Sequence, residues 1–193
     1  MQELERLAGK EAANGRIILA HLGNGASLAA VKNGKSIETS MGFTPPSGVI
    51  MGTRRRDLDP GVAWYMMQFK KISPRQFNHL VNHESELLGI SETNSDIREL
   101  MTSENSDNRA SDAIEMFCYQ IKKSIGSFAA VLGGIDTLVF SGGIGEYIPQ
   151  IRSRICQDLG FLGIELDEKR NQKNDPIIST DTGKVTVRVI ATN

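Results

Sequence analysis

The chain has 193 residues, of which 39% are hydrophobic and 23% are charged, and its formal net charge is −1. These values are typical of a globular protein with a sizeable core, and they give no electrostatic reason to expect nucleic acid or an anionic membrane as a partner. No apolar run reaches the ~18 residues of a membrane span, and the N-terminus lacks the pattern of a secretory signal. We expect Cys118 and Cys156 to pack as small hydrophobic side chains in a reducing compartment. The sequence therefore predicts a cytoplasmic protein without a membrane partner.

The first forty residues predict one short helix followed by three strands. Two Asn-Gly pairs separate the strands, and this dipeptide between apolar runs is the strongest local signal for a two-residue hairpin. Strands with such short links form an antiparallel meander. The predicted helix covers residues 1–12, and the predicted strands cover 16–21, 26–32 and 36–40.

The middle of the chain is predicted to be helical. Asp59 and Ser73 each precede a proline, which places a capping residue before the first helical position of helices that run to about 69 and 82. The loop 42–48 contains Pro45 and Pro46, which are incompatible with a central strand. A long helix is predicted over 110–132 and ends at Gly133-Gly134. Its apolar stripe consists of Ile114, Phe117, Ile121, Ile125 and Phe128.

The last third of the chain predicts a strand over 136–140, a tight turn over 141–145, a helix over 149–159 and a strand over 184–191. A strand–helix–strand unit implies a right-handed crossover and parallel pairing. The predicted fold class is therefore α/β, a mixed five-stranded sheet flanked by helices. No linker divides the chain, so residues 1–193 are predicted to be a single domain.

The first candidate site is the bend at residues 21–27. Gly23 and Gly25 permit positive φ and remove the Cβ atoms that would keep a ligand away. Such a tip exposes backbone N–H groups that suit an anion such as phosphate. A plain hairpin explains the Asn-Gly pair equally, although the flanking His21 and Ser27 have no structural need to be polar.

The second candidate site is the glycine-rich turn from Ser141 to Glu146. It lies between a predicted strand and a predicted helix, where α/β proteins collect ligands. Ile148 stands where a dinucleotide-binding motif needs its last glycine, and no Lys-Ser/Thr pair follows as in a Walker loop. The sequence fits both interpretations of this segment, a tight turn and a ligand-binding loop.

Several other polar residues have a structural explanation as well as a functional one. Arg54, at the head of three consecutive arginines, is either part of a solvated basic loop or a guanidinium aimed at phosphoryl oxygens. Asp107 is explained by helix capping. His79 and His83 have zinc-ligand spacing without a third ligand, so we predict no metal site there.

These segments, in this order, resemble the C-terminal domain of acetate kinase, and the resemblance covers nearly the whole chain. Propionate and butyrate kinases are close relatives that the motifs separate poorly. The resemblance implies the ribonuclease-H-like fold shared by sugar kinases and actin-like ATPases. The matching segments are residues 21–27, 39–45, 51–54, 57–60, 87–91, 140–146, 161–164 and 191–193.

The resemblance also implies roles for individual residues. His21, Asn24 and Gly25 would hold the phosphates of ATP or ADP, and Arg54 would neutralise charge on the transferring phosphoryl group. Asp107 would accept hydrogen bonds from the ribose and Arg109 would lie against the adenine. His21 and Arg54 are the predicted catalytic residues. The predicted nucleotide-binding residues are His21, Leu22, Gly23, Asn24, Gly25, Asp107, Asn108, Arg109, Gly142, Gly143, Ile144, Gly145, Glu146 and Tyr147.

The sequence departs from the family pattern at several places. Tyr147 replaces the usual Asn, and Arg55 and Arg56 replace small or polar residues. Family members are about twice as long, so we expect the N-terminal acetate-binding half to be absent. The family continues past Asn193 into Glu-Glu, so we also expect this chain to lack the Mg²⁺ ligands.

Three expectations about the chain as a whole follow from the resemblance. The chain is a nucleotide-binding half that has negligible kinase activity alone. It pairs into a homodimer, for which the apolar surface of the 110–132 helix is a candidate. The alternative is a non-catalytic adenine-nucleotide-binding module.

Overall fold

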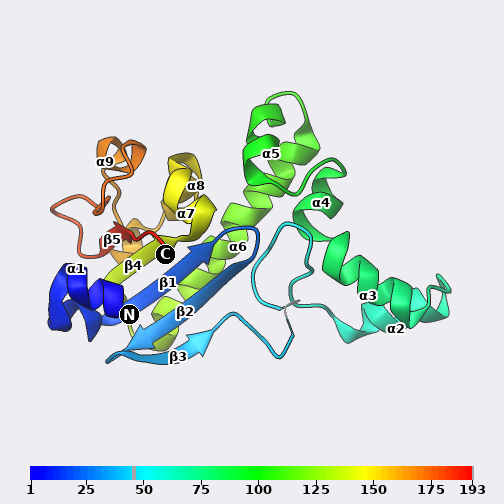
Figure 1. Ribbon diagram of the computed structural model, residues 1–193, viewed down its shortest axis with the longest axis horizontal. Coiled ribbons are helices and arrows are strands. Elements are labelled where there is room, and N and C mark those ends of the chain that lie inside the picture. The colour runs from blue at the N-terminus through cyan, green and yellow to red at the C-terminus, as the bar shows by residue number, and fades with distance from the viewer. Residues whose placement is uncertain (45–46, 193) are drawn as a thin grey trace. The chain divides into compact units, whose positions relative to one another are not determined.

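The structure, a computed structural model, describes residues 1–44 and 47–192 and divides into two compact units (Figure 1). The sheet unit comprises residues 1–40 and 121–193, and the helical unit comprises residues 41–120. Pro45 and Pro46 of the predicted loop, and Asn193 of the closing motif, lie outside the described residues.

The sheet unit contains every strand of the described chain. Its strands are β1 (Arg16–Leu22), β2 (Ala26–Lys32), β3 (Lys35–Thr39), β4 (Thr137–Ser141) and β5 (Thr186–Val189). Its helices are α1 (Gln2–Ala13), α7 (Gly142–Tyr147), α8 (Pro149–Cys156), the 3-10 turn η1 (Gly160–Leu162) and α9 (Glu168–Gln172), together with the second half of α6 (Asn108–Leu132).

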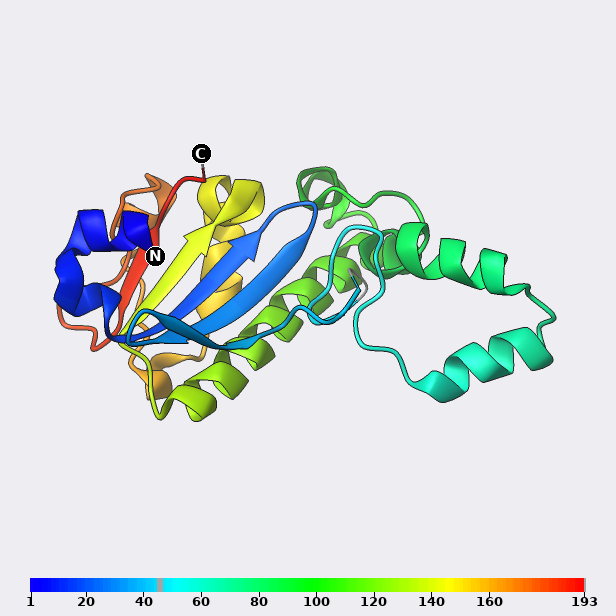
Figure 2. The same cartoon turned by 60° about the horizontal axis from the view of Figure 1, so that its bottom comes forward.

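The sheet has the strand order β3-β2-β1-β4-β5 (Figure 2). The first three strands pair antiparallel as a meander, whereas β4 pairs parallel with both β1 and β5. The predicted mixed five-stranded sheet, with a parallel strand–helix–strand unit at its end, is therefore confirmed. The Asn33-Gly34 hairpin is also confirmed, because both residues have the positive φ values, 52° and 70°, of a type I′ turn.

Side chains of the central strands alternate between two apolar layers. Ile17, Val31 and Val139 pack with Leu4 of α1 in one layer. Ile18, Leu138 and Phe140, which point the other way along their strands, are fully buried. In Figures 1 and 2 the second half of α6 lies along the sheet, and its stripe residues Ile121, Ile125 and Phe128 are buried.

The helical unit comprises α2 (Pro60–Gln68), α3 (Pro74–His83), α4 (Glu86–Ser91), α5 (Ile97–Ser103) and the first half of α6. Both predicted helix starts are confirmed. Asp59 accepts a hydrogen bond from the Gly61 amide, and Ser73 forms a reciprocal capping box with Gln76. Within residues 1–44 and 47–192, no helix has the length and apolar character needed to cross a bilayer.

Several predicted elements differ from the observed ones. The turn predicted over 141–145 is instead the short helix α7, and the helix predicted to reach residue 159 ends at Cys156. The short helices α4, α5 and α9 were not predicted. They have five to seven residues each, and a helix of that length is too short to show a helical period of hydrophobic residues in the sequence.

Gly142 joins β4 to α7 by a close approach to the neighbouring strand. Its φ is +77°, and an added Cβ atom would lie 2.6 Å from the backbone oxygen of Leu22 at the end of β1. A methyl group has no room there, since the obstacle is backbone and cannot swing away. Gly143, one residue later, has no atom within 4 Å of the same position.

We therefore expect Gly142→Ala to destabilise the protein by about 2 kcal/mol or more, because it combines a backbone clash with an unfavourable φ. Urea unfolding followed by circular dichroism measures the difference. Gly143→Ala is the matched control and is expected to leave the unfolding midpoint no lower than in the wild type. Equal midpoints for the two variants would contradict the close approach.

Candidate functional site

The two glycine-rich bends meet at one end of the sheet. His21 and Ser141 are partners in the parallel β1–β4 pairing, and His21 Nδ1 lies 3.3 Å from Ser141 Oγ. A Cβ atom added to Gly23 would lie 3.9 Å from the Gly143 amide nitrogen. The bend after β1 and the turn after β4 therefore lie side by side at the carboxyl ends of parallel strands, where α/β folds bind ligands.

The bend after β1 is a three-residue loop, so the predicted two-residue hairpin is wrong. Leu22 pairs with Ala26, which leaves Gly23, Asn24 and Gly25 in the loop. None of the three has a positive φ, and the Gly23 amide donates to the Gly25 carbonyl at 3.0 Å. His21 and Asn24 are exposed, whereas Leu22 is buried, so only the first two offer their side chains to a ligand.

The turn after β4 is held by a buried carboxylate. Glu146 Oε1 accepts hydrogen bonds from the Gly142 amide at 2.8 Å and from the Thr192 amide and hydroxyl at 2.9 and 2.8 Å. Burial opposes ionisation of this carboxyl group, but the hydrogen bonds from Thr192, Gly142 and Tyr147 outweigh it and lower the pKa of Glu146. Glu146 is thus ionised at neutral pH, and its carboxylate is engaged by hydrogen bonds within the fold. Gly143 and Tyr147 of the same turn are exposed.

A residue that sequence reasoning missed lies directly behind this turn. Arg152 of α8 is completely buried, and its guanidinium donates to the carbonyls of Gly145 and Glu146, both at 2.9 Å. The available signal was its position on the predicted helix, because Ile148, Arg152 and Ile155 share one face at i, i+4 and i+7. An arginine within an apolar face must find buried acceptors.

In the helical unit, the arginine run divides into one exposed and two anchored residues. The Arg56 amide donates to the buried Glu86 carboxylate at 3.0 Å, and Arg56 Nη1 donates to Gln120 Oε1 at 2.9 Å. The Arg55 amide donates to the Val81 carbonyl at 2.7 Å, and its Nε lies 3.8 Å from Glu86. Arg54 is exposed and forms no hydrogen bond or ion pair with any residue that the structure describes.

Asp107 and Arg109 lie at the start of α6 and contact each other. Asp107 Oδ1 accepts from the Arg109 amide at 2.9 Å, which confirms its capping role. Arg109 Nη1 donates to Glu92 at 2.6 Å, and Asn108 between them is exposed. A ligand at this helix start would therefore meet an arginine already engaged by two carboxylates.

The histidine pair forms no metal site with a third ligand. His79 and His83 stack with ring centroids 4.9 Å apart, and His79 Nε2 lies 3.3 Å from Glu84. Across the two described ranges, 1–44 and 47–192, no cluster of three or more His, Cys, Asp or Glu side chains is suited to a metal ion.

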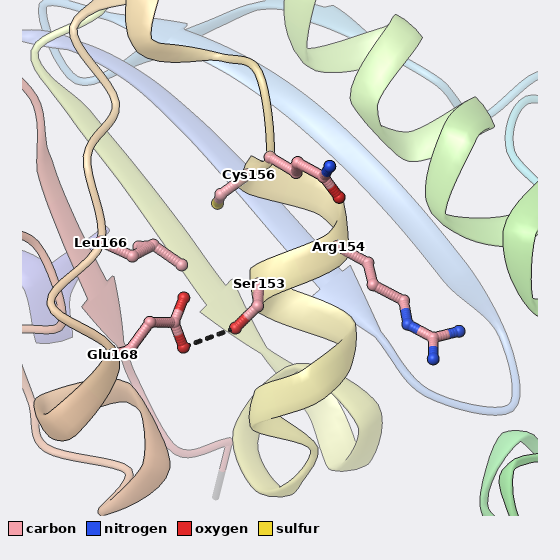
Figure 3. A pocket seen from close by; sticks show the side chains of 6 residues that line it. Ser153, Arg154, Cys156, Leu166 and Glu168 are labelled. Carbon is pink, nitrogen blue, oxygen red and sulfur yellow. Dashed lines mark hydrogen bonds between the residues drawn. The ribbon is translucent and has the colours of Figure 1, made fainter.

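The sheet unit also has a pocket of about 360 Å³ beside α8 (Figure 3). Ser153 and Glu168 face each other across it and share a 2.8 Å hydrogen bond, while Arg154 points away from this pair. Cys156 lies in the wall, and burial raises the pKa of its thiol to about 12. No residue predicted to bind the nucleotide lines this pocket, so it is separate from the two bends.

Comparisons with known proteins identify relatives of this chain. The chain is 47% identical to acetate kinase from Symbiobacterium thermophilum over 195 residues, covering 100% of the chain and 49% of that protein. It is 48% identical to propionate kinase PduW from Salmonella typhimurium over 179 residues, covering 92% of the chain and 44% of that protein. The chain thus spans about half the length of the curated relatives that it matches.

Solved structures show the same fold. The crystal structure of Porphyromonas gingivalis acetate kinase matches with a TM-score of 0.94 at 41% identity, covering 100% of the chain and 49% of that structure. A propionate kinase structure from Francisella tularensis matches with a TM-score of 0.91 at 37% identity, again covering 100% of the chain and 49% of the structure. The model of the acetokinase family matches residues 1–193, and this chain is therefore a member of the acetokinase family.

Proposed function

We propose that this chain supplies the nucleotide-binding half of a kinase that transfers a phosphoryl group between ATP and acetate, giving acetyl phosphate and ADP. The observation that carries the proposal is the meeting of the two bends at the carboxyl ends of β1 and β4, in a chain of the acetokinase family. The relatives include both acetate and propionate kinases, so propionate is the alternative acceptor. The acyl preference is expected to depend on the other half of the enzyme.

In the sheet unit, the proposed contacts come from the two bends. His21 and Asn24 hold the phosphates with their exposed side chains, aided by backbone amides of the loop from Leu22 to Gly25. The turn from Gly142 to Tyr147 forms a wall of the adenosine pocket, with the exposed Gly143 and the partly buried Ile144 against the base. Glu146 supports this wall from inside, because its Oε1 already accepts three hydrogen bonds.

The exposed Tyr147 is proposed to replace the usual asparagine by stacking on the adenosine. At the start of α6, Asp107 accepts hydrogen bonds from the ribose and Arg109 lies against the adenine, with Asn108 beside them.

Arg54 is the proposed catalytic residue of the helical unit. Its guanidinium is unpaired among the described residues, which leaves it available to the transferring phosphoryl group. Phosphoryl transfer needs positioning and charge neutralisation at the three equatorial oxygens, and a planar guanidinium matches that geometry. The transfer is proposed to be in line, without a covalent intermediate on the protein.

The Mg²⁺ that such a kinase uses is usually held by one or two carboxylates together with water and the substrate phosphates. We assign no step to the metal here. The complete enzyme is proposed to work in the cytoplasm, in keeping with two buried cysteines that form no disulfide.

The isolated 193-residue chain is expected to bind ADP weakly and to have negligible kinase activity. Calorimetry measures ADP binding, and Asn24→Ala is expected to weaken it by about tenfold through loss of a hydrogen bond to a charged phosphate. Gln150→Ala, an exposed residue of α8, is the matched control.

Trapping of acetyl phosphate with hydroxylamine measures kinase activity. Absence of heat with folded wild-type protein would argue against nucleotide binding, and robust acetyl phosphate formation would refute the claim of inactivity. If the chain binds ADP but no longer protein that contains it has kinase activity, the result would instead support the alternative of a non-catalytic adenine-nucleotide-binding module.

In an active enzyme that contains this segment, Arg54→Ala is expected to lower kcat by about a thousandfold, because arginines at this step contribute that much to phosphoryl transfer. The KM for acetate should change little. Steady-state kinetics provides the measurement, and Arg75→Ala, in the same unit on exposed α3, is the control. Unchanged turnover in Arg54→Ala would remove Arg54 from the mechanism.

We also propose that the chain forms a homodimer. Met116, Tyr119 and Val131 are exposed apolar side chains of α6. A second exposed apolar cluster lies on α2, where Trp64 and Tyr65 both pack against Phe69 at ring-centroid distances of 5.4 and 5.3 Å. The ring cluster on α2 is a larger apolar surface than a single exposed side chain, and Met116 and Tyr119 are neighbours on α6 at i and i+3.

Sedimentation equilibrium is expected to give a dimer, and Met116→Ser/Tyr119→Ser is expected to shift it toward monomer by removing apolar contact area. The double variant Trp64→Ser/Phe69→Ser tests the α2 cluster in the same way. Dissociation by the second pair alone would move the interface to α2, and a monomeric wild type would overturn the proposal.

A further inference from the structure

Arg152 is a buried charge that forms no hydrogen bond or ion pair with a carboxylate among the described residues. Its side chain is completely inaccessible, and every acceptor of its guanidinium is a carbonyl or amide oxygen. Nε donates to Asn171 Oδ1 at 2.8 Å, and Nη2 donates to Asn171 O at 2.8 Å and to Asn174 Oδ1 at 2.6 Å. Nη1 donates to the carbonyls of Gly145 and Glu146.

Burial lowers the pKa of Arg152 to about 10, against the opposing influence of Cys156 and Glu168, so the group remains charged at neutral pH. Desolvating a cation is costly, and apolar side chains of similar volume often replace buried ionic groups with no loss of stability. Stability alone is therefore a weak reason for an arginine at this position.

The geometry of Nη1 gives a stronger reason. It bonds two successive carbonyls at the carboxyl end of α7, where a helix leaves its last oxygens without partners. Two bonds to consecutive peptide groups fix the planes of both, and thereby the direction of the amide groups in the turn. Glu146 holds the opposite end of the same turn through the Gly142 amide.

The guanidinium is itself held from the far side. Asn171 accepts from Arg152 through its side-chain and backbone oxygens, and its own amide donates to Pro149 O at 3.0 Å and Ser153 Oγ at 2.8 Å. Asn171 is completely buried. The planar fork of Arg152 therefore has one orientation, set by α8 and the segment around α9.

We infer that Arg152 is a positioning residue for nucleotide binding, which fixes the turn from Gly142 to Tyr147 in the conformation that receives the adenosine. This inference rests on the proposed function, because it assumes that this turn is a wall of the nucleotide pocket. The position of Arg152 behind the turn means that it acts through the Gly145 and Glu146 carbonyls and does not touch the ligand.

The test uses the 193-residue chain with ADP as the probe. Arg152→Met removes every hydrogen bond of the guanidinium while keeping a similar length, and Arg170→Met is the matched control. Arg170 bonds Asp181 and the Ser179 carbonyl and makes no bond to α7. Calorimetry gives the ADP affinity, and amide hydrogen exchange gives the local opening of residues 143–148 and of β1.

Arg152→Met is expected to weaken ADP binding by about tenfold or more, as for loss of hydrogen bonds from a charged donor. Exchange at residues 143–148 should accelerate by a similar factor, with β1 unchanged, because only the turn loses its support. Arg170→Met should change neither measurement. A folded Arg152→Met protein with wild-type affinity, or with uniformly faster exchange in both segments, would overturn the inference.

A second variant covers the case in which Arg152→Met does not fold. Asn174→Gly removes one acceptor and keeps the positive φ of 55° at that position. Faster exchange confined to residues 143–148 would support the inference, and an unchanged rate there would overturn it. If the wild type does not bind ADP, the proposed function fails, whereas the exchange measurements still decide whether Arg152 fixes the turn.

Discussion

The parallel pairing of β1 with β4 is the interaction on which the candidate site depends. The two strands are separated by more than a hundred residues, yet their register brings His21 opposite Ser141 and ends both strands at the same edge. The close approach of Gly142 to the Leu22 carbonyl then fixes the turn after β4 against the end of β1. A different register would move one bend along the sheet and separate the two surfaces that are proposed to contact the nucleotide together.

Buried charged groups hold the candidate loops in both units, although the loops themselves are largely backbone. In the sheet unit, Glu146 and Arg152 secure opposite ends of α7. In the helical unit, Glu86 accepts the Arg56 amide and lies near Arg55 Nε, while adopting a φ of 51° that costs a non-glycine residue about 1 kcal/mol. The two extra arginines thus belong to the support of the loop and leave Arg54 exposed. Backbone strain of this kind is concentrated at functional sites.

Local sequence signals predicted the elements that depend on local physics. The capping residues Asp59 and Ser73, the Asn33-Gly34 hairpin and the buried stripe of α6 all follow from propensity and period. The loop at Gly23–Gly25 differed because the pairing of Leu22 with Ala26 leaves three residues between the strands. Arg152 and Glu146 were beyond prediction as supports, since Asn171 and Asn174, which accept from Arg152, and Thr192, which donates to Glu146, lie 19 to 46 residues away in the sequence. Motif order alone identified the family, while the nearness of the two bends required the fold.

The two cysteines have a practical consequence for following the folding of this chain. Cys118 lies in the helical unit and Cys156 in the sheet unit, and both side chains are buried and form no disulfide. Because a thiol reacts as its thiolate, the raised pKa of Cys156 adds chemical inertness to its inaccessibility. Each unit thus contains one buried thiol that an alkylating reagent reaches only after that unit has unfolded. Mass spectrometry of the labelled peptides would resolve the two events separately, without introducing any foreign reporter.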